Sequence, residues 1–241
     1  MHDAALVVQG VDVYYGLAHV VQSATLRVDR ECVALMGRNG AGKTSLVRAL
    51  MGITPPRASG AVRLGGHALE RLPSHARARL GVGYVPQGRR LFPSLTVLEH
   101  LTLAARAGPG PGDWSVDKVF ELFPSLAPRR AAYGDQISGG ERSMLAIGRA
   151  LMGNPACLVL DEPTEGLAPA VVDRVAQGLH RLAASGMSVL LVEQSLRPVL
   201  QAASRVLFMH AGRIVEESTP AALQAAPELL ERMLGLVAAE G

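Results

Sequence analysis

The octapeptide Gly37-Arg38-Asn39-Gly40-Ala41-Gly42-Lys43-Thr44 fits the pattern G-x-x-x-x-G-K-[ST]. It follows an all-apolar run, Cys32–Met36, that is typical of a buried parallel strand, and a helix is expected from Lys43 to about Met51. Glycines let backbone N–H groups surround phosphate oxygens, and the start of a helix adds positive partial charge. The octapeptide therefore predicts a phosphate-binding loop between a strand and a helix.

Two side chains of this loop carry groups suited to a nucleoside triphosphate. Lys43 can reach the β and γ phosphates, and the Thr44 hydroxyl can bind Mg²⁺. Lysine occurs at only two positions in the 241 residues, and one of them is the position where a compact ammonium is needed. The alternative, a glycine-rich turn with an exposed lysine, leaves that coincidence unexplained.

A second apolar run, Cys157-Leu158-Val159-Leu160, ends in the acids Asp161 and Glu162. The carboxyl end of a parallel strand opens onto the ligand crevice of such a sheet. Asp161 can hold Mg²⁺ directly or through water, and Glu162 can polarise an attacking water molecule. Two solvated acids before Pro163 are the alternative interpretation. Downstream of a phosphate loop, the catalytic interpretation is favoured.

The segment Ile137-Ser138-Gly139-Gly140-Glu141 is predicted to begin a helix that runs to about Met152. Ser138 with Glu141 three residues later forms a capping box, which is sufficient for a helix start. It does not explain Gly139 and Gly140, because glycines weaken a first helical turn. Their backbone N–H groups would be open to an anion. The sequence therefore predicts a second phosphate site, distant along the chain from the first.

Composition excludes several classes of protein. With 49% hydrophobic and 19% charged residues the chain can bury a sizeable core. Aromatic residues make up only 4%, the formal net charge is +3 and the arginines are scattered, so no nucleic-acid partner is expected. No apolar stretch reaches the roughly 18–20 residues that span a bilayer, and the N-terminus does not resemble a signal peptide. Cys32 and Cys157 are interpreted as reduced, buried thiols.

Strands that alternate with helices predict an α/β fold with a parallel sheet. Residues 94–150 are expected to be mostly helical, broken by a glycine–proline loop at 108–112. The other expected elements are strands at 6–13 and 21–28 on the edge of a sheet, a hairpin at 60–69 with a turn at Gly65-Gly66, strands at 82–86, 157–160 and 187–192, a helix at Pro169–Ala184, a hairpin at 206–216 and amphipathic helices at the end of the chain.

Together these motifs resemble the ATP-binding subunits of ABC transporters, over nearly the whole chain. The phosphate loop resembles the Walker A motif, Asp161-Glu162 the Walker B motif, and residues 137–141 the signature motif. Gln87, after Tyr84-Val85-Pro86, matches the Q-loop of that family, and Tyr15 matches the aromatic residue that stacks on adenine.

The resemblance implies an α/β P-loop NTPase fold. It would have a RecA-like parallel sheet core, an antiparallel β subdomain and an inserted helical subdomain. The whole of 1–241 would be one ATPase domain. Residues 1–93 and 154–241 would form the nucleotide-binding core with the β subdomain, and residues 94–153 the helical subdomain with the signature motif.

The resemblance also implies an activity, the hydrolysis of ATP to ADP and phosphate coupled to solute transport. Two such domains would close head to tail around two ATP molecules. The residues implied to bind ATP are Tyr15, Gly37, Arg38, Asn39, Gly40, Ala41, Gly42, Lys43, Thr44 and Ser45, with Ser138, Gly139 and Gly140 contacting the nucleotide held by a second ATPase subunit. Mg²⁺ would be held by Thr44, Gln87 and Asp161, and the catalytic residues would be Glu162, Gln87 and Gln194.

A narrower resemblance is to the ATPases of branched-chain amino acid importers, with urea and amide importers as relatives. The residues that carry it lie in 88–93, 146–152, 164–169 and 192–194. It implies a peripheral protein at the cytoplasmic face of a bacterial plasma membrane. Its partners would be a second ATPase subunit, in a homodimer or a paired heterodimer, integral membrane permease subunits and, indirectly, a solute-binding protein. The permease helices would dock near Leu91 and Phe92, for which core packing is the alternative.

The sequence departs from most of the family at Gln194, where a histidine is usual. A glutamine can hydrogen-bond a phosphate oxygen but cannot titrate near neutral pH. Glu193 beside it is interpreted as a solvated acid.

Two other functions remain open on the motifs alone. One is an ATP-gated dimerising ATPase of DNA repair or translation that is not coupled to transport, and the other is a monomeric P-loop kinase or nucleotide hydrolase.

Overall fold

The computed structural model describes residues 5–106, 108–110, 113–226 and 228 of the chain. Within them the strands form two sheets. The larger sheet has six strands in the order β10-β9-β3-β8-β7-β6. These strands are β3 (Cys32–Met36), β6 (Val82–Val85), β7 (Cys157–Asp161), β8 (Ser188–Glu193), β9 (Arg205–His210) and β10 (Arg213–Ser218). All neighbours pair in parallel except β10, which is antiparallel to β9.

Strands β3, β7 and β8 are buried along their whole length. Their near-continuous apolar sequences are typical of strands that are covered on both faces. In β3 the side chains alternate between two cores: Cys32, Ala34 and Met36 pack on one side of the sheet, Val33 and Leu35 on the other. The parallel sheet is therefore the middle layer of the fold.

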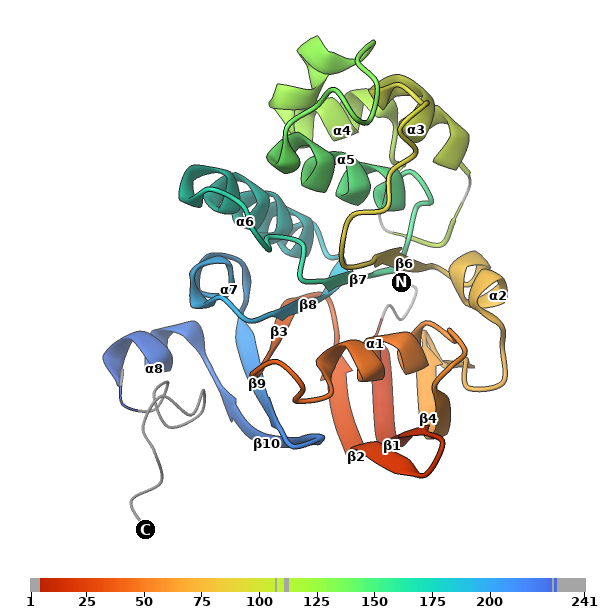
Figure 1. The fold of residues 1–241 in the computed structure, drawn as a ribbon, viewed down its shortest axis with the longest axis vertical. Helices are drawn as coiled ribbons and strands as arrows, with labels where there is room; N and C mark the ends of the chain where they lie inside the picture. The colour runs from red at the N-terminus through yellow and green to blue at the C-terminus, as the bar shows by residue number, and fades with distance from the viewer. Residues whose placement is uncertain (1–4, 107, 111–112, 227, 229–241) are drawn as a thin grey trace.

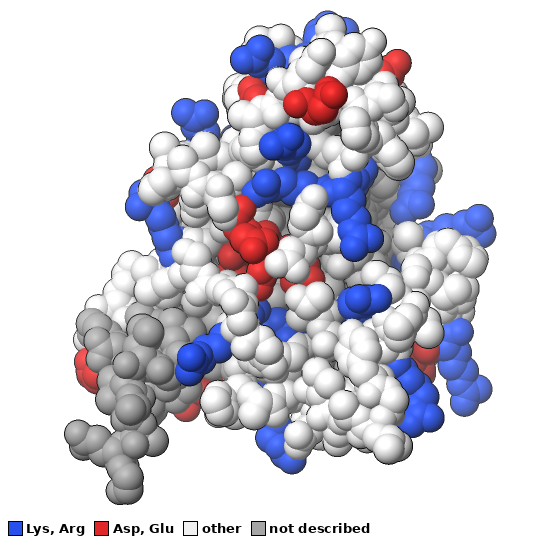
Figure 2. Space-filling model, viewed as in Figure 1, with Lys and Arg blue, Asp and Glu red and all other residues white. Residues whose placement is uncertain are grey.

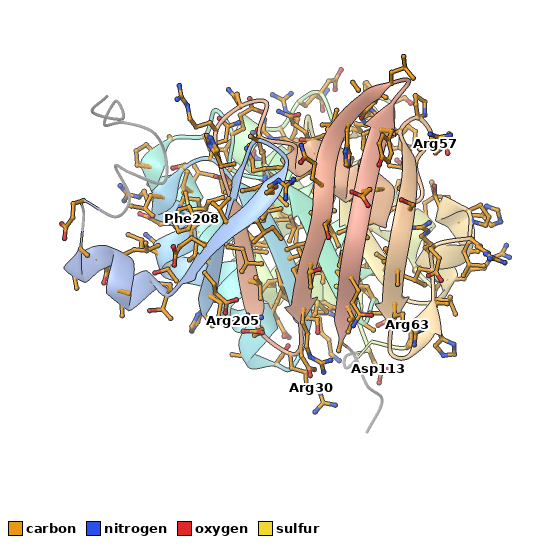
Figure 3. The ribbon with its side chains drawn as sticks, turned by 90° about the horizontal axis from the view of Figure 1, so that it is seen from below. Arg30, Arg57, Arg63, Asp113, Arg205 and Phe208 are labelled. Carbon is orange, nitrogen blue, oxygen red and sulfur yellow. The ribbon has the colours of Figure 1, made fainter. Side chains whose placement is uncertain are left out.

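The second sheet is antiparallel, in the order β2-β1-β4-β5. Its strands are β1 (Leu6–Tyr15), β2 (Ala18–Val28), β4 (Arg57–Leu64) and β5 (His67–Ala68). Figure 3 shows the strands of this sheet side by side across the lower face, with Arg57 and Arg63 near opposite ends of β4. The hairpin with its turn at Gly65-Gly66 is confirmed.

The expectation that 6–13 and 21–28 lie on the edge of a sheet is confirmed for 21–28, because β2 is an edge strand of this sheet, and is wrong for 6–13. β1 is an interior strand that pairs with both β2 and β4, and this sheet is separate from the parallel one. Buried and more exposed residues alternate along β1 and β2, which is typical of an antiparallel sheet with one face on a core. The choice of β4 as a partner joins residues about fifty positions apart, which local alternation cannot reveal.

The helices cover both faces of the parallel sheet (Figure 1). α1 (Lys43–Leu50) packs between the two sheets, in the same core as β1, β2 and β4. On the opposite side lie α3 (Val97–Ala104), α4 (Val116–Leu122), the 3₁₀ turn η1 (Pro124–Arg129), α5 (Gly139–Leu151) and α6 (Pro169–Ala184). The remaining described helices are α2 (Ser74–Arg79), α7 (Leu196–Ala202) and α8 (Pro220–Ala225).

Several predicted elements are confirmed. The helix after the phosphate loop, the helical character of 94–150 and the hairpin at 206–216, with its turn at Ala211 and Gly212, are all present. The loop at 108–112 and the amphipathic helices at the end of the chain fall partly outside the described residues. In the part of the chain that is described, no helix has the length and apolar character needed to cross a membrane.

Candidate functional site

The loop 37–44 connects the carboxyl end of β3 to α1. A side chain at Gly37 would overlap the backbone oxygen of Met209, and Gly40 and Gly42 have φ angles of +80° and +106°, which favour glycine. Gly42 caps α1 without a side-chain hydrogen bond, so the first N–H groups of the helix are not occupied by a cap. The loop therefore presents backbone donors at a helix start, as anion binding requires.

A cavity of about 220 Å³ lies over this loop. It is lined by Val20, Asn39, Gly40, Ala41, Gly42, Lys43, Thr44, Ser45, Gln87 and Glu162. The lining thus joins the loop to residues that lie more than forty and more than one hundred positions further along the chain. All of these residues except Val20 are among those that the sequence predicts for the site.

Lys43 is buried at the centre of the loop, with 4% of its surface exposed. Its Nζ donates hydrogen bonds to the carbonyl oxygens of Gly37, at 2.7 Å, and of Arg38, at 3.3 Å. Nζ also lies 3.6 Å from Oε1 of Glu162. The ammonium is therefore held in place by two carbonyls of its own loop and by the carboxylate of Glu162, which follows β7.

Asp161 is the last residue of β7 and is fully buried. The Thr44 hydroxyl donates a hydrogen bond to its Oδ1 at 3.3 Å, while Oδ2 has no hydrogen-bond partner among the described residues. Burial raises the pKa of Asp161 to about 6, against the hydrogen bond from Thr44, which lowers it. A buried carboxylate oxygen without a partner, next to a hydroxyl, is a donor set that fits a hard divalent cation.

Glu162 follows with φ +50°, a left-handed conformation that is uncommon for a side chain of this size. Its backbone N–H donates to the carbonyl of Val192 at 2.9 Å. Two amides donate to its carboxylate: Gln194 Nε2 lies 2.6 Å from Oε1, and Gln87 Nε2 lies 3.0 Å from Oε2. Glu162 is thus in direct contact with the two other residues predicted to be catalytic.

Ser138 caps α5, and the predicted capping box is confirmed. The Glu141 N–H donates to Ser138 Oγ at 3.2 Å, and the Ser138 N–H donates to Glu141 Oε2 at 2.8 Å. A Cβ at Gly139 would meet nothing closer than Leu167 at 3.6 Å. At Gly140 it would overlap the side chain of Val171 on α6. Packing within the chain therefore requires Gly140, whereas Gly139 is open. Neither residue lines the cavity over Lys43.

The comparisons with known proteins agree with this geometry. A family model described as "ABC transporter" matches residues 22–165, more than half of the chain. The chain belongs to the ABC transporter family. It is an ATP-binding subunit of such a transporter, an ATPase in which ATP hydrolysis is coupled to transport, and ATPases of this family pair with permease subunits and with another ATPase.

Among its relatives is the high-affinity branched-chain amino acid transport ATP-binding protein BraG of Pseudomonas aeruginosa, 41% identical over 93% of this chain and 97% of the relative. The lipopolysaccharide export system ATP-binding protein LptB of Escherichia coli K12 is 33% identical over 90% of this chain and 91% of its own length. A crystal structure of a nucleotide-free ATP-binding cassette from an ABC transporter superposes with a TM-score of 0.80 at 23% identity, and covers 95% of this chain and 98% of that one. The last comparison supports the ABC ATPase fold.

Tyr15 is the one predicted ATP contact from the first strand of this ABC ATPase. It ends β1 and pairs with Ala18 at the tip of the β1–β2 hairpin. Together with Gly16 and Leu17 it lines a separate hollow, and it is not part of the cavity over the Walker A loop. The structure therefore does not bring Tyr15 to the phosphate site, whose contribution from this hairpin is Val20.

The interpretation of Glu193 as a solvated acid is wrong. Glu193 is the last residue of β8, only 2% of its surface is exposed, and its Oε1 accepts hydrogen bonds from the N–H and the hydroxyl of Thr164. Burial raises the pKa of Glu193, while the hydrogen bonds from Thr164 lower it. Its place at the end of the apolar run 189–192 in a central strand is the signal that could have predicted burial.

Sequence reasoning also missed a link between the Q-loop, the signature helix and the Walker B turn. Arg89 Nε donates to Ser143 Oγ at 2.7 Å, and Ser143 Oγ donates to the carbonyl of Pro163 at 2.8 Å. Arg89 also donates to the backbone oxygen of Glu165, whose carboxylate accepts a hydrogen bond from Gln87 Nε2 at 3.1 Å. Figure 2 shows acidic side chains gathered near the middle of the face, with basic side chains directly above them.

Leu91 and Phe92, the predicted docking residues, have different environments. Leu91 packs against the core beneath the helices, whereas 53% of Phe92 is exposed. Phe92 lines a groove of about 820 Å³ together with residues of α2, β6, α3 and α5, including Tyr84, Arg90, Leu103, Arg106 and Arg149. The Phe92 N–H donates to Nε2 of the buried His100 at 2.9 Å, so this segment is anchored while its ring faces the groove.

Proposed function

We propose that this chain is the ATP-hydrolysing subunit of a bacterial importer for branched-chain amino acids or a similar small organic solute. The contact of Glu162 with Lys43, Gln87 and Gln194 carries the proposal for the mechanism. The similarity to BraG, over nearly the full length of both chains, supports the solute class. The lower identity to LptB makes export of a lipid-linked solute the weaker alternative.

The phosphates of ATP would lie against the N–H groups of residues 37–44 at the start of α1. Lys43, already oriented by two carbonyls, would transfer its ion pair from Glu162 to the β and γ phosphates. Mg²⁺ would be held by Thr44, Gln87 and Asp161, where it would neutralise charge on the phosphate oxygens. The partnerless Oδ2 of Asp161 is the observation that supports this assignment.

Glu162, once released from Lys43, would accept a hydrogen bond from the attacking water and orient it toward the γ-phosphorus. The amide of Gln194 would then bind a γ-phosphate oxygen in the place of the usual histidine. The water oxygen forms the new bond to the γ-phosphorus and the water's proton passes to the Glu162 carboxylate, while the bond to the β–γ bridging oxygen breaks with its electron pair left on ADP, so that ADP and phosphate are the products. None of these steps requires residue 194 to titrate.

The second phosphate contact would come from another ATPase subunit, because Ser138 and Gly139 do not line the cavity of their own chain. ATP would close two subunits head to tail, with Ser138, Gly139 and Gly140 of each facing the γ-phosphate on the other and Tyr15 on adenine. The groove beside Phe92 would receive a cytoplasmic helix of the permease. The chain would thus act at the cytoplasmic face of the membrane, and a solute-binding protein would act through the permease.

Light scattering on purified Glu162→Gln protein tests the ATP-driven closure. We expect a shift from monomer to dimer with ATP and Mg²⁺ and no shift with either alone, together with loss of hydrolysis. ATP binding without a dimer, both alone and with co-purified permease, would contradict the closure mechanism. Retained hydrolysis would contradict the role of Glu162.

The solute class is tested with the complete transporter in proteoliposomes. We expect leucine, presented with the solute-binding protein, to stimulate ATP hydrolysis and to accumulate in the lumen, and urea to do neither. Stimulation by urea or an amide alone would reassign the solute within the importer group. An ATPase rate that does not respond to the permease would favour an ATPase that is not coupled to transport.

A further inference from the structure

The buried carboxylate of Glu193 has no role in the mechanism described above. Its Oε1 accepts two hydrogen bonds from a single residue, from Thr164 N at 3.0 Å and from Thr164 Oγ1 at 2.7 Å. Both residues are buried, with 2% and 4% of their surfaces exposed. Burying a carboxylate is unfavourable unless hydrogen bonds compensate it, so these contacts are necessary for the residue to be there at all.

The position of this pair joins two parts of the catalytic site. Glu193 ends β8 and directly precedes Gln194, whereas Thr164 lies two residues after Glu162. β7 and β8 are paired only up to Asp161 and Val192. Beyond that point three contacts join the segments that follow the two strands. They are the hydrogen bond from Glu162 N to Val192 O, the Glu193–Thr164 pair and the contact from Gln194 to Glu162.

The turn after β7 has a conformation that needs such support. Glu162 has a φ of +50°, which persists only where surrounding contacts hold it. Val192 O holds the backbone of Glu162 from one side, and the Glu193 carboxylate holds Thr164 from the other. The turn from Glu162 to Thr164 is therefore held at both ends by residues at the end of β8.

We propose that Glu193 is a positioning residue for ATP hydrolysis: by binding Thr164 it fixes the turn that aims Glu162 at the attacking water. The inference rests on the proposed roles of Glu162 and Gln194. Small displacements of a group that orients a reactant reduce the rate strongly. ATP binding depends instead on the Walker A loop. The hydrogen bonds between Glu193 and Thr164 do not involve that loop.

Four variants test the proposal: Glu193→Ala, Thr164→Val, Thr164→Ser and the Glu193→Ala/Thr164→Val double variant. We expect Glu193→Ala and Thr164→Val each to lower kcat by about 10- to 100-fold. The KM for ATP and ATP binding should stay near wild type. Thr164→Ser keeps both donors and should keep most of the activity. The double variant should be no slower than Glu193→Ala, because Glu193→Ala already removes both hydrogen bonds, including the hydroxyl bond that Thr164→Val removes.

The matched control is Ser188→Ala at the opposite end of β8. Ser188 is also buried, and its Oγ accepts a hydrogen bond from Arg30 N at 2.9 Å. This variant should lower the melting temperature and leave kcat unchanged. If Ser188→Ala lowers kcat as much as Glu193→Ala at equal loss of stability, Glu193 acts only through stability and the proposal fails.

The Glu162→Gln variant distinguishes a failure of the proposed function from a failure of the positioning role of Glu193. If it still hydrolyses ATP, the proposed function is at fault. If it is inactive while Glu193→Ala and Thr164→Val keep the wild-type kcat, only the positioning role is overturned. If Glu193→Ala does not fold, the comparison of Thr164→Ser with Thr164→Val decides, since equal kcat values in these two would overturn the proposal.

Discussion

Lys43 Nζ lies 3.6 Å from Glu162 Oε1, and only 4% and 5% of the two side chains are exposed. The cation that the Walker A loop offers to phosphate is therefore paired with the carboxylate proposed to orient water. Two amides, from Gln87 and Gln194, complete the contacts of that carboxylate. A γ-phosphate would compete with Glu162 for Lys43, so binding of ATP and release of the catalytic carboxylate would be the same event.

Replacing Lys43 removes the cationic partner of the phosphates. We expect Lys43→Ala to weaken ATP binding by about 10- to 100-fold, since hydrogen bonds to charged groups contribute about 1.5–3 kcal/mol. Isothermal titration calorimetry measures the change. Lys118→Ala, which removes the other lysine of the chain at an exposed position on α4, is the matched control and should bind ATP like wild type. If both variants bound ATP with equal affinity, Lys43 would have no role in ATP binding.

The two glycines of the signature motif should respond differently to substitution. Gly140→Ala should destabilise the chain by about 1–3 kcal/mol, because the added methyl overlaps Val171 in a packed helix contact. Gly139→Ala meets only contacts of 3.6 Å and longer and should leave stability unchanged or slightly raised. Chemical denaturation measures both.

A substitution at Gly139 also tests whether the start of α5 contacts a second subunit. In a Glu162→Gln background, Gly139→Trp should keep ATP binding and lose the ATP-driven dimer in light scattering. A dimer that persists would show that the start of α5 does not face the nucleotide of the partner subunit.

The meeting of the candidate catalytic residues was predictable because each of them ends or follows a strand. Asp161 ends β7 and Glu162 follows it, while Gln87 follows β6 and Gln194 follows β8. All four lie at the carboxyl ends of parallel strands, where ligands bind. Order along the chain and residue type were sufficient to predict that meeting. The roles of these side chains remain proposals that the experiments above test.

The errors have a common physical origin, which is tertiary packing between distant elements. The close contact of Gly140 with Val171 on a different helix was not predicted, and the anion contact of Gly140 stays a prediction. Glu193 was interpreted as solvated, although its partner Thr164 lies 29 positions away. Strand β1 was expected at the edge of a sheet but is interior, because its second partner, β4, follows the whole of β3 and α1 along the chain. Local patterns show which faces are apolar, but they do not identify the elements that cover them.

The Arg89–Ser143–Pro163 chain of hydrogen bonds should couple the helical layer to the Walker B turn. Ser143→Ala removes the acceptor of Arg89 Nε and the donor to Pro163 O in a site where Ser143 is 1% exposed. We expect a loss of about 1–3 kcal/mol, the cost of leaving such groups unpaired. Arg89→Ala added to Ser143→Ala should cost less than the sum of the two single changes. Strict additivity in urea unfolding would show that the contact carries no energy.

Asp161 should destabilise the chain at neutral pH in the absence of Mg²⁺. Its pKa is raised by burial to about 6, so the folded state holds a proton that the unfolded state loses near pH 4. The stabilising contribution of this proton is complete below about pH 4 and is lost as the pH rises through about 6. A shift of this size corresponds to roughly 2–3 kcal/mol.

Asp161→Asn keeps an oxygen for the Thr44 hydroxyl and has no charge to bury. It should therefore raise the free energy of unfolding at pH 7.5 with EDTA present, have little effect at pH 4, and abolish ATP hydrolysis. The measurement is urea unfolding of wild type and variant across this pH range. A difference between the two proteins that does not change between pH 4 and pH 7.5 would contradict the raised pKa. A variant that is stabilised yet still hydrolyses ATP would contradict the role of Asp161 as a Mg²⁺ ligand. Replacing a residue that catalysis needs can raise stability, but it should then lower activity.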